Sequence, residues 1–167
     1  DGQAIWLTVI LLIVIAILKT DSFATSRNLT NVLGQYTSLM LVTAGMLAVV
    51  VTGHIDLSVA SQVRLVAVLM SGVADGNNVK FIFALVLVTV IACFVGFMNS
   101  LIINTFNIDA FIVTLGMSII LEGAAYAYTE KGEGSIPMSV SDFVYGSVGP
   151  LPYVFMIGIG MLVFLSQ

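Results

Sequence analysis

The sequence predicts an all-α fold, a polytopic bundle of transmembrane helices with a broken or re-entrant segment around residues 52-58. Hydrophobic residues make up 59% of the 167 residues, charged residues make up 8%, and the mean hydropathy is +1.14. Because a soluble domain carries about 25% charged residues, this chain has too few to cover a surface that faces water. Its apolar runs are continuous, which excludes the alternation with period two that is typical of membrane β-barrel strands.

Six apolar stretches are predicted to form membrane spans within one transmembrane domain that covers residues 1-167. They are residues 4–18, 27 or 28 to 51, 57–73, 81–103, 110–126 and 154–165. Ser26 is expected to cap the second span, and residues 139–142 are expected to begin a short surface helix. Since one crossing needs about 20 residues, we expect the sixth span to be cut short and the chain to be the N-terminal portion of a longer protein.

Charge and residue counts exclude several classes of function. Nucleic-acid binding requires clustered basic side chains, whereas the five Lys and Arg residues are scattered and the net charge is −4. Cys93 and His54 are single residues of their kinds, so neither a disulfide framework nor a metal site is predicted. We therefore expect no nucleic-acid partner and no cofactor.

The segment 50–61 places polar groups between two apolar runs. Gly53 is expected to end the second span, and His54, Asp56 and Ser58 follow it. An ionised Asp at the middle of a membrane costs roughly 2.5–3.5 kcal/mol on insertion scales, so it marks a candidate functional site. Two readings stay open for Asp56: its carboxylate lines a path for a solute, or it caps the third span and fixes the helix break.

Small residues recur at helical spacing in the fourth span. Ala92, Gly96 and Ser100 form a row that is expected to let another helix approach closely. Ser58 and Ser61, near the start of the third span, are interpreted as capping and helix-packing hydroxyls rather than as solute ligands.

Polar residues also recur along one face of the fifth span. Thr114, Ser118 and Glu122 are four residues apart and so share a helix face, which is expected to face protein or water rather than lipid. Arg64 lies inside the third span, where a charge must pair, snorkel or face a cavity. A pair between Arg64 and Glu122 across two helices is one solution.

The cluster of His54, Asp56 and Ser58 also suggests a hydrolase. A catalytic triad, however, is recognised by geometry and roles rather than by nearness in sequence, and nothing in the chain resembles a nucleophile elbow. No catalytic residue is predicted, and His54 is interpreted as an interfacial or gate residue.

Three segments together resemble the membrane permease of sugar-type ABC importers, the group that serves ribose, xylose and multiple sugars. They are residues 27–33 (RNLTNVL), residues 53–61 (GHIDLSVAS, against a family pattern G-x-I-D-L-S-V-G-S) and residues 110–117 (AFIVTLGM, against P-x-F-I-x-T-L). His54, in the second segment, and the pair Thr20-Asp21, which precedes the first segment, favour the xylose or multiple-sugar branch. The chain departs from the family at several positions, which include Arg64, where the family is apolar, and Glu122, where Arg is common; the others are Ala60, Ser100 and Asp109.

The resemblance implies a multi-pass protein of the inner (plasma) membrane that works as a homodimer, so a second permease copy and membrane lipid are expected partners. It further implies a cytoplasmic ATP-binding subunit and a periplasmic or extracellular sugar-binding protein. The chain has no G-x-x-x-x-G-K-S/T pattern, so it is not expected to be an enzyme, and ATP is expected to bind the partner subunit.

The resemblance makes the polar residues of the spans candidates for a sugar path. Asn99 and Thr114 either contact sugar hydroxyls or only bridge helices, and Phe111 either stacks on a sugar ring or packs as a core aromatic. The predicted path or gate residues are His54, Asp56, Ser58, Asn99, Phe111 and Thr114, and the predicted break and packing residues are Gly53, Ser61 and Gly96.

Two other functions stay open. Ion-coupled secondary transporters also use broken helices and buried acids, in which case Asp56 or Glu122 carries the proton. A structural membrane subunit without a path of its own is the third reading, and it predicts that transport survives replacement of Asp56 and Asn99 by Ala.

Overall fold

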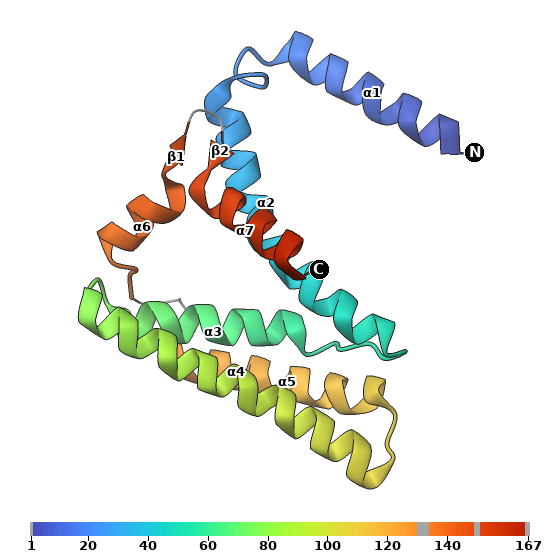
Figure 1. Cartoon of the computed structure of the whole chain (residues 1–167), viewed down its shortest axis with the longest axis vertical. Helices are drawn as coiled ribbons and strands as arrows, with labels where there is room; N and C mark the ends of the chain where they lie inside the picture. The colour runs from blue at the N-terminus through green and yellow to red at the C-terminus, as the bar shows by residue number, and fades with distance from the viewer. Residues whose placement is uncertain (1, 130–133, 149–150, 166–167) are drawn as a thin grey trace. The chain divides into compact units, whose positions relative to one another are not determined.

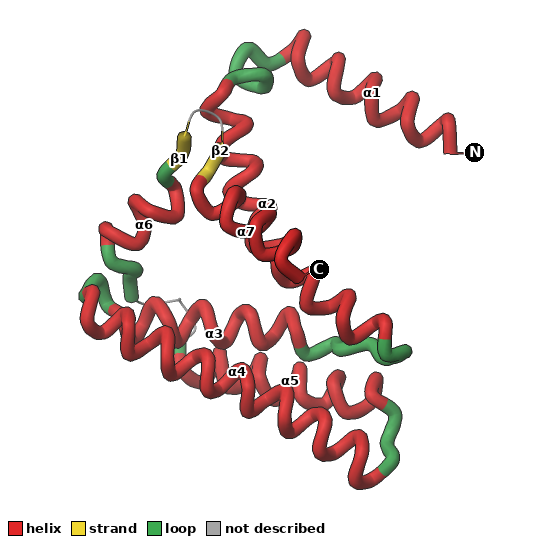
Figure 2. Tube along the Cα trace, in the orientation of Figure 1, coloured by secondary structure: helices red, strands yellow, loops and turns green. Residues whose placement is uncertain are grey.

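The computed structural model describes residues 2–129, 134–148 and 151–165, and helices form most of this part of the chain (Figure 1, Figure 2). In chain order the elements are α1 (Gly2–Lys19), α2 (Ser26–Val51), α3 (Val59–Ala74), α4 (Asn78–Phe106), α5 (Ala110–Tyr128), α6 (Met138–Tyr145), β1 (Ser147–Val148), β2 (Leu151–Pro152) and α7 (Tyr153–Leu165). The two strands form only a short antiparallel ladder, in which Ser147 pairs with Pro152. The predicted all-α class is confirmed, as is the interruption between the second and third predicted spans.

The chain divides into two compact units. One comprises Asp1–Met40 with Phe143–Gln167, and the other comprises Leu41–Asp142. The helix interruption and all the predicted path, break and packing residues belong to the second unit.

The capping prediction at the start of α2 was wrong by one residue. Ser26 is the first residue of the helix, and the hydroxyl of Thr25 accepts a hydrogen bond from the Asn28 N–H at 3.3 Å. A hydroxyl that precedes the helix and reaches the third helical N–H satisfies one of the free donors of the first turn. Thr25 therefore has the N-capping role that was predicted for Ser26.

In the first unit, α7 packs against the first half of α2. Thr37 is buried, and a Cβ added at Gly158 would lie 3.3 Å from its methyl carbon. The rings of Phe143 and Tyr153 are stacked, with centroids 6.0 Å apart. The short ladder of β1 and β2 brings the chain to the start of α7.

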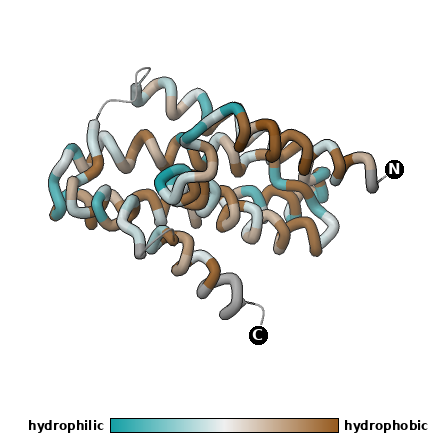
Figure 3. Tube along the Cα trace, turned by 90° about the horizontal axis from the view of Figure 1, so that it is seen from above, coloured by the Kyte–Doolittle hydropathy of each residue, from teal (hydrophilic) through white to brown (hydrophobic). Residues whose placement is uncertain are grey.

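In the second unit, α3 packs against both α4 and α5, and the three helices lie side by side (Figure 1). The buried core is small and consists of Leu65, Val95, Leu121 and Ala125. Large apolar side chains such as Phe94 are instead exposed on the outer faces of the helices. Strongly hydrophilic residues lie mainly at helix ends and in the connections (Figure 3). This distribution is typical of helices that contact lipid, where the surrounding solvent is as apolar as the side chains.

Within the described residues, three helices, α2, α4 and α5, are long and apolar enough to cross a membrane. The apolar helix α3 is shorter, with 16 residues, or about 24 Å at the usual rise per residue. The hydrocarbon core of a bilayer is about 30 Å thick. A crossing by the third predicted span would have to include the non-helical residues before α3, so we expect irregular backbone at membrane depth there.

Candidate functional site

The interruption begins where α2 ends at Val51. The Thr52 N–H donates to the Val49 carbonyl at 3.1 Å, and the Gly53 N–H donates to the Val50 carbonyl at 2.9 Å. Gly53 has a φ of +84°, a left-handed conformation that glycine adopts without a steric penalty and that commonly ends helices. The chain then leaves the helix axis and enters the non-helical segment that leads to α3.

The carboxylate of Asp56 organises this segment. Its Oδ1 accepts hydrogen bonds from the Ser58 N–H at 2.8 Å and from the Ser58 hydroxyl at 2.6 Å. Ser58 occupies the N-cap position of α3 and is fully buried, but its side chain makes no capping hydrogen bond. The capping role expected for the Ser58 hydroxyl is absent because the hydroxyl turns back to Asp56. The carboxylate thus fixes the helix break through Ser58 and does not cap the first turn of α3 itself.

Asn99 connects α4 to the interruption. Its Nδ2 donates to the Ser58 Oγ at 3.1 Å, and the residue is 5% exposed. The Asn99 Oδ1 is buried and has no hydrogen-bond partner among the described residues. Asp56, Ser58 and Asn99 therefore form a chain of hydrogen bonds from the loop into α4, and its last member carries a free acceptor.

Thr114 connects α5 to the same segment. Its Oγ1 accepts a hydrogen bond from the Leu57 N–H at 3.1 Å and donates to the Ala110 carbonyl at 2.8 Å. The residue is almost completely buried. Because buried backbone N–H groups need a partner, the hydroxyl supplies one at a point where no helix or strand can.

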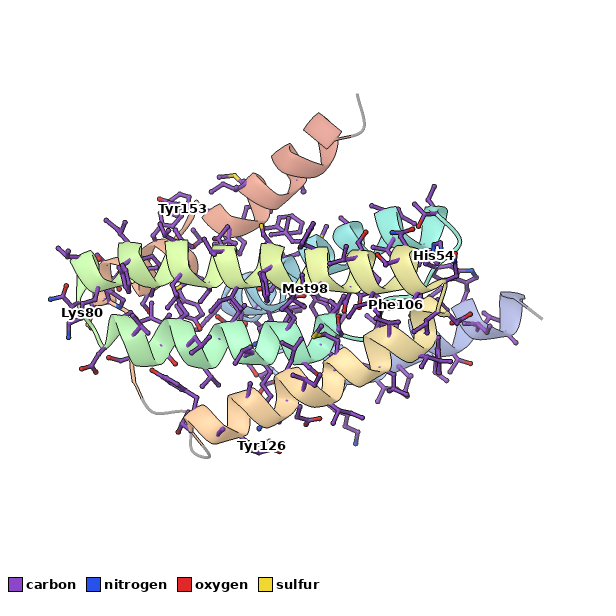
Figure 4. All side chains as sticks on the ribbon, turned by 90° about the horizontal axis from the view of Figure 1, so that it is seen from below. His54, Lys80, Met98, Phe106, Tyr126 and Tyr153 are labelled. Atoms are coloured by element: carbon purple, nitrogen blue, oxygen red, sulfur yellow. The ribbon has the colours of Figure 1, made fainter. Side chains whose placement is uncertain are left out.

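A cavity of about 390 Å³ lies beside the interruption. It is at the end of α3, α4 and α5 where His54 and Phe106 lie, opposite the end marked by Lys80 (Figure 4). Its polar lining residues are Thr52, His54, Asp56, Asn99, Ser100, Asn104 and Thr114, and its apolar ones are Val49, Ile55, Gly96, Ile103 and Ala110. None of these described lining residues is Lys or Arg, so the cavity offers hydrogen-bonding groups and one carboxylate to a solute.

The structure brings together four of the six predicted path residues. His54, Asp56, Asn99 and Thr114 line the cavity. Ser58 is buried behind Asp56 and is not part of the lining. Phe111 is neither a core aromatic nor a lining residue, because its side chain is 51% exposed.

Three polar lining residues, Thr52, Ser100 and Asn104, were not predicted to line a solute path; Ser100 was named only as a packing residue. Asn104 was assigned to a connection, but α4 continues to Phe106, which places the Asn104 amide within 2.7 Å of the Ser100 carbonyl. The available signal was the spacing of four residues between Ser100 and Asn104, which puts both on one helix face.

The close helix contact expected at Gly96 is not formed by the described residues. A Cβ added there would meet no atom within 4 Å, and Gly96 lines the cavity. The lack of a side chain at Gly96 widens the cavity and does not serve a close contact with a neighbouring helix. Ala92, in the same row, does face α3, where its carbonyl accepts a hydrogen bond from Gln62 at 3.1 Å.

The polar face of α5 is directed at α3. Below Thr114, the hydroxyls of Ser61 and Ser118 lie 2.7 Å apart. One turn further, the Arg64 Nη1 lies 3.3 Å from the Glu122 Oε1. The expectation that this face meets protein is met, and the predicted pair of Arg64 and Glu122 is present. Two of the residues that depart from the family pattern, Arg64 and Glu122, thus lie against each other.

The Arg64 guanidinium also lies 4.0 Å from the ring centroid of Tyr126, which is labelled in Figure 4. A guanidinium over an aromatic face gains a cation–π interaction. Arg64 is therefore held by a carboxylate and a ring, both from α5, although the Arg64 and Glu122 side chains are 40% and 50% exposed.

Replacing Arg64 by Leu, or Glu122 by Leu, is expected to lower the yield of folded protein and its thermal unfolding midpoint in detergent. Each variant leaves one unpaired charge in a membrane bundle, where a charge costs roughly 2.5–3.5 kcal/mol at the helix centre. The double variant removes both charges and is expected to recover most of the loss. A double variant no more stable than the weaker single variant would contradict a pairing role.

The chain is similar to curated membrane permeases. It is 33% identical over 117 residues to the inner membrane ABC transporter permease protein YjfF of Escherichia coli, covering 70% of this chain and 34% of that protein. It is 30% identical over 149 residues to the galactose/methyl galactoside import permease protein MglC of Escherichia coli, covering 83% of this chain and 44% of that protein. It is 33% identical over 121 residues to the ribose import permease protein RbsC of Escherichia coli, covering 71% and 37%.

The chain thus spans less than half the length of these curated relatives. No family model and no solved structure matches it.

Proposed function

This chain is a homologue of the permease subunits of sugar-type ABC importers over the part that it shares with them, and we propose that it lines the path of a monosaccharide through such an importer. The observation that carries this proposal is the cavity beside the helix interruption. It combines uncharged hydrogen-bonding groups from α4 and α5 with the Asp56 carboxylate, and irregular backbone at membrane depth occurs where it is buried in protein or lines a watery cavity.

The cavity suits a neutral polyol better than an anion. Asp56 places a negative charge in its wall, and no described lining residue supplies a compensating Lys or Arg. A neutral sugar exchanges hydrogen bonds with Asn, Ser and Thr side chains without charge desolvation. A modest number of such bonds favours a weak site, which lets the solute leave after it has entered.

The proposed partners follow from the import permeases that this chain resembles. They are an ATP-binding subunit at the cytoplasmic face, a sugar-binding protein on the outer side and a second copy of the permease. The two permease copies are proposed to lie in the inner membrane. ATP-driven rearrangement of the helices would alternately open the cavity to the two sides.

The proposed solute is a pentose or hexose, and xylose is the first to test because His54 and Thr20-Asp21 favour that branch. Relatives named for ribose and for galactose or methyl galactoside make those sugars the next members of the panel.

The test is uptake by proteoliposomes that contain the full-length protein with its ATP-binding subunit and binding protein. We expect uptake of one sugar of the panel to require both ATP inside and the binding protein outside. Uptake driven by a pH gradient alone would assign the protein to the ion-coupled secondary transporters instead. Unchanged uptake in the Asp56→Ala/Asn99→Ala double variant would indicate a structural subunit without a path.

A further inference from the structure

The buried side-chain oxygen of Asn99 is a hydrogen-bond acceptor without a donor. The orientation of the amide follows from its neighbours. The Ser58 hydroxyl has a single hydrogen to donate. Its Oγ lies 2.6 Å from the Asp56 Oδ1, and the carboxylate oxygen accepts this hydrogen. The Ser58 Oγ can then only accept from Asn99, so the Asn99 Nδ2 faces Ser58 at 3.1 Å. The Asn99 Oδ1 is left as the free group.

An unpaired buried acceptor is costly and uncommon. It costs about 1–3 kcal/mol, and about nine in ten buried polar groups in native structures are paired. Two of the other polar lining groups already donate elsewhere: the Thr114 hydroxyl donates to the Ala110 carbonyl, and the Asn104 amide donates to the Ser100 carbonyl. Asn99 lines the cavity, so an occupant of the cavity is a source of the missing donor.

We propose that Asn99 is a specificity-determining residue whose Oδ1 accepts a hydrogen bond from one hydroxyl of the sugar in the cavity. This inference rests on the proposed function. The Oδ1 is shielded in the described arrangement, so the hydroxyl reaches it when α4 moves slightly away from the interruption. Binding the solute then removes the cost of the unpaired acceptor and favours that displaced arrangement, which couples occupancy of the cavity to movement of α4.

A hydroxyl fits this acceptor better than a metal cation does. Hard divalent cations take about six to eight oxygen ligands, and the described residues contain no group of three or more His, Cys, Asp or Glu side chains that could hold a metal ion. A hydroxyl needs only one acceptor, which is what Asn99 offers.

The experiment compares a transported sugar with its monodeoxy analogues in proteoliposomes that contain the complete transporter. Maximal uptake rates are measured with saturating, sugar-loaded binding protein for the wild type, Asn99→Leu, Asn99→Ala and Ser58→Ala. Because the same binding protein delivers every sugar, its own preference cancels when the ratio of parent to analogue is compared between variants. Ser58→Ala is the matched control, since it removes the Ser58–Asn99 hydrogen bond but keeps the Asn99 oxygen.

In the wild type we expect one analogue, which lacks the hydroxyl that meets Asn99, to be transported about tenfold more slowly than the parent sugar. In Asn99→Leu and Asn99→Ala this ratio falls toward one, while the ratios for the other analogues do not change. Ser58→Ala slows all sugars alike and keeps the tenfold preference. A purely structural Asn99 would change all rates together and leave every ratio as it was.

Several outcomes would overturn the inference. An unchanged ratio in both Asn99 variants removes the contact. A Na⁺ dependence of uptake that disappears in the Asn99 variants assigns the oxygen to a cation. These failures are distinct from failure of the proposed function, in which the wild type transports no sugar with ATP and binding protein.

Discussion

Replacing Asp56 by Ala is expected to reduce ATP-driven sugar uptake at least tenfold. The substitution removes the acceptor of both the Ser58 N–H and the Ser58 hydroxyl, and Ser58 is fully buried. Each buried polar group left without a partner costs about 1–3 kcal/mol, so the start of α3 and the cavity wall are expected to rearrange. Initial uptake rates in proteoliposomes, normalised to the amount of assembled transporter, measure the effect.

Asp109→Ala is the matched control for this prediction. Asp109 is also an acid before a helix, and its Oδ1 accepts from the Phe111 N–H at 2.8 Å, but it does not line the cavity. Loss of this cap costs about 0.5–2 kcal/mol of stability and is expected to leave the uptake rate per folded transporter close to wild type. Asp56→Asn keeps an acceptor oxygen and is expected to retain more uptake than Asp56→Ala. Equal uptake by Asp56→Ala and Asp109→Ala would contradict the role of Asp56.

Replacing Gly134 by Ala is expected to cause the largest loss of stability among single glycine substitutions in the described residues. Gly134 has a φ of +104°, which costs a residue with a side chain about 1–3 kcal/mol. Its added Cβ would also collide with the Ser71 carbonyl and lie 2.7 Å from the Gly72 Cα. Because these are backbone atoms of α3 that cannot turn aside, overpacking adds about 1–3 kcal/mol.

The expected result is a lower thermal unfolding midpoint in detergent and a looser attachment of the segment after Gly134. That segment contacts the turn after α3, where the Gly76 N–H donates to the Ser135 carbonyl at 2.9 Å. Hydrogen exchange at the Gly76 amide is expected to accelerate in the variant. The control is Gly116→Ala on α5, where an added Cβ meets no atom within 4 Å and Ala raises helix propensity. A Gly134→Ala variant as stable as Gly116→Ala would contradict the close backbone approach.

The ends of helices show where sequence reasoning was accurate and where it was not. α5 begins at Ala110, as predicted, because Asp109 offers a capping carboxylate directly before an apolar run. The start of α2 was misplaced because Thr25 and Ser26 are both capping residues and Ser is the more favoured of the two. The fold of the preceding turn makes Thr25 the capping residue. In that turn the Phe23 N–H donates to the Thr20 carbonyl.

The cavity residues could be recognised as polar but not assigned to roles. Ser58 and Asp56 are two residues apart and both suit the start of a helix, so the local sequence could not tell which one would turn its side chain inward. Phe111 and Thr114 are close together on α5, yet Phe111 is exposed and Thr114 is buried. That difference depends on which face of α5 meets α3.

By itself the sequence determined that this protein is a bundle of membrane helices interrupted near Asp56, because long apolar runs and the penalty for a charge in lipid are local properties of the chain. Only the tertiary structure decided that Asp56, Ser58 and Asn99 form one hydrogen-bonded chain and that the Asn99 oxygen is left free. Hydrogen bonds between residues 41 positions apart depend on how α3 and α4 are rotated against each other, and the packing of whole helices sets that rotation.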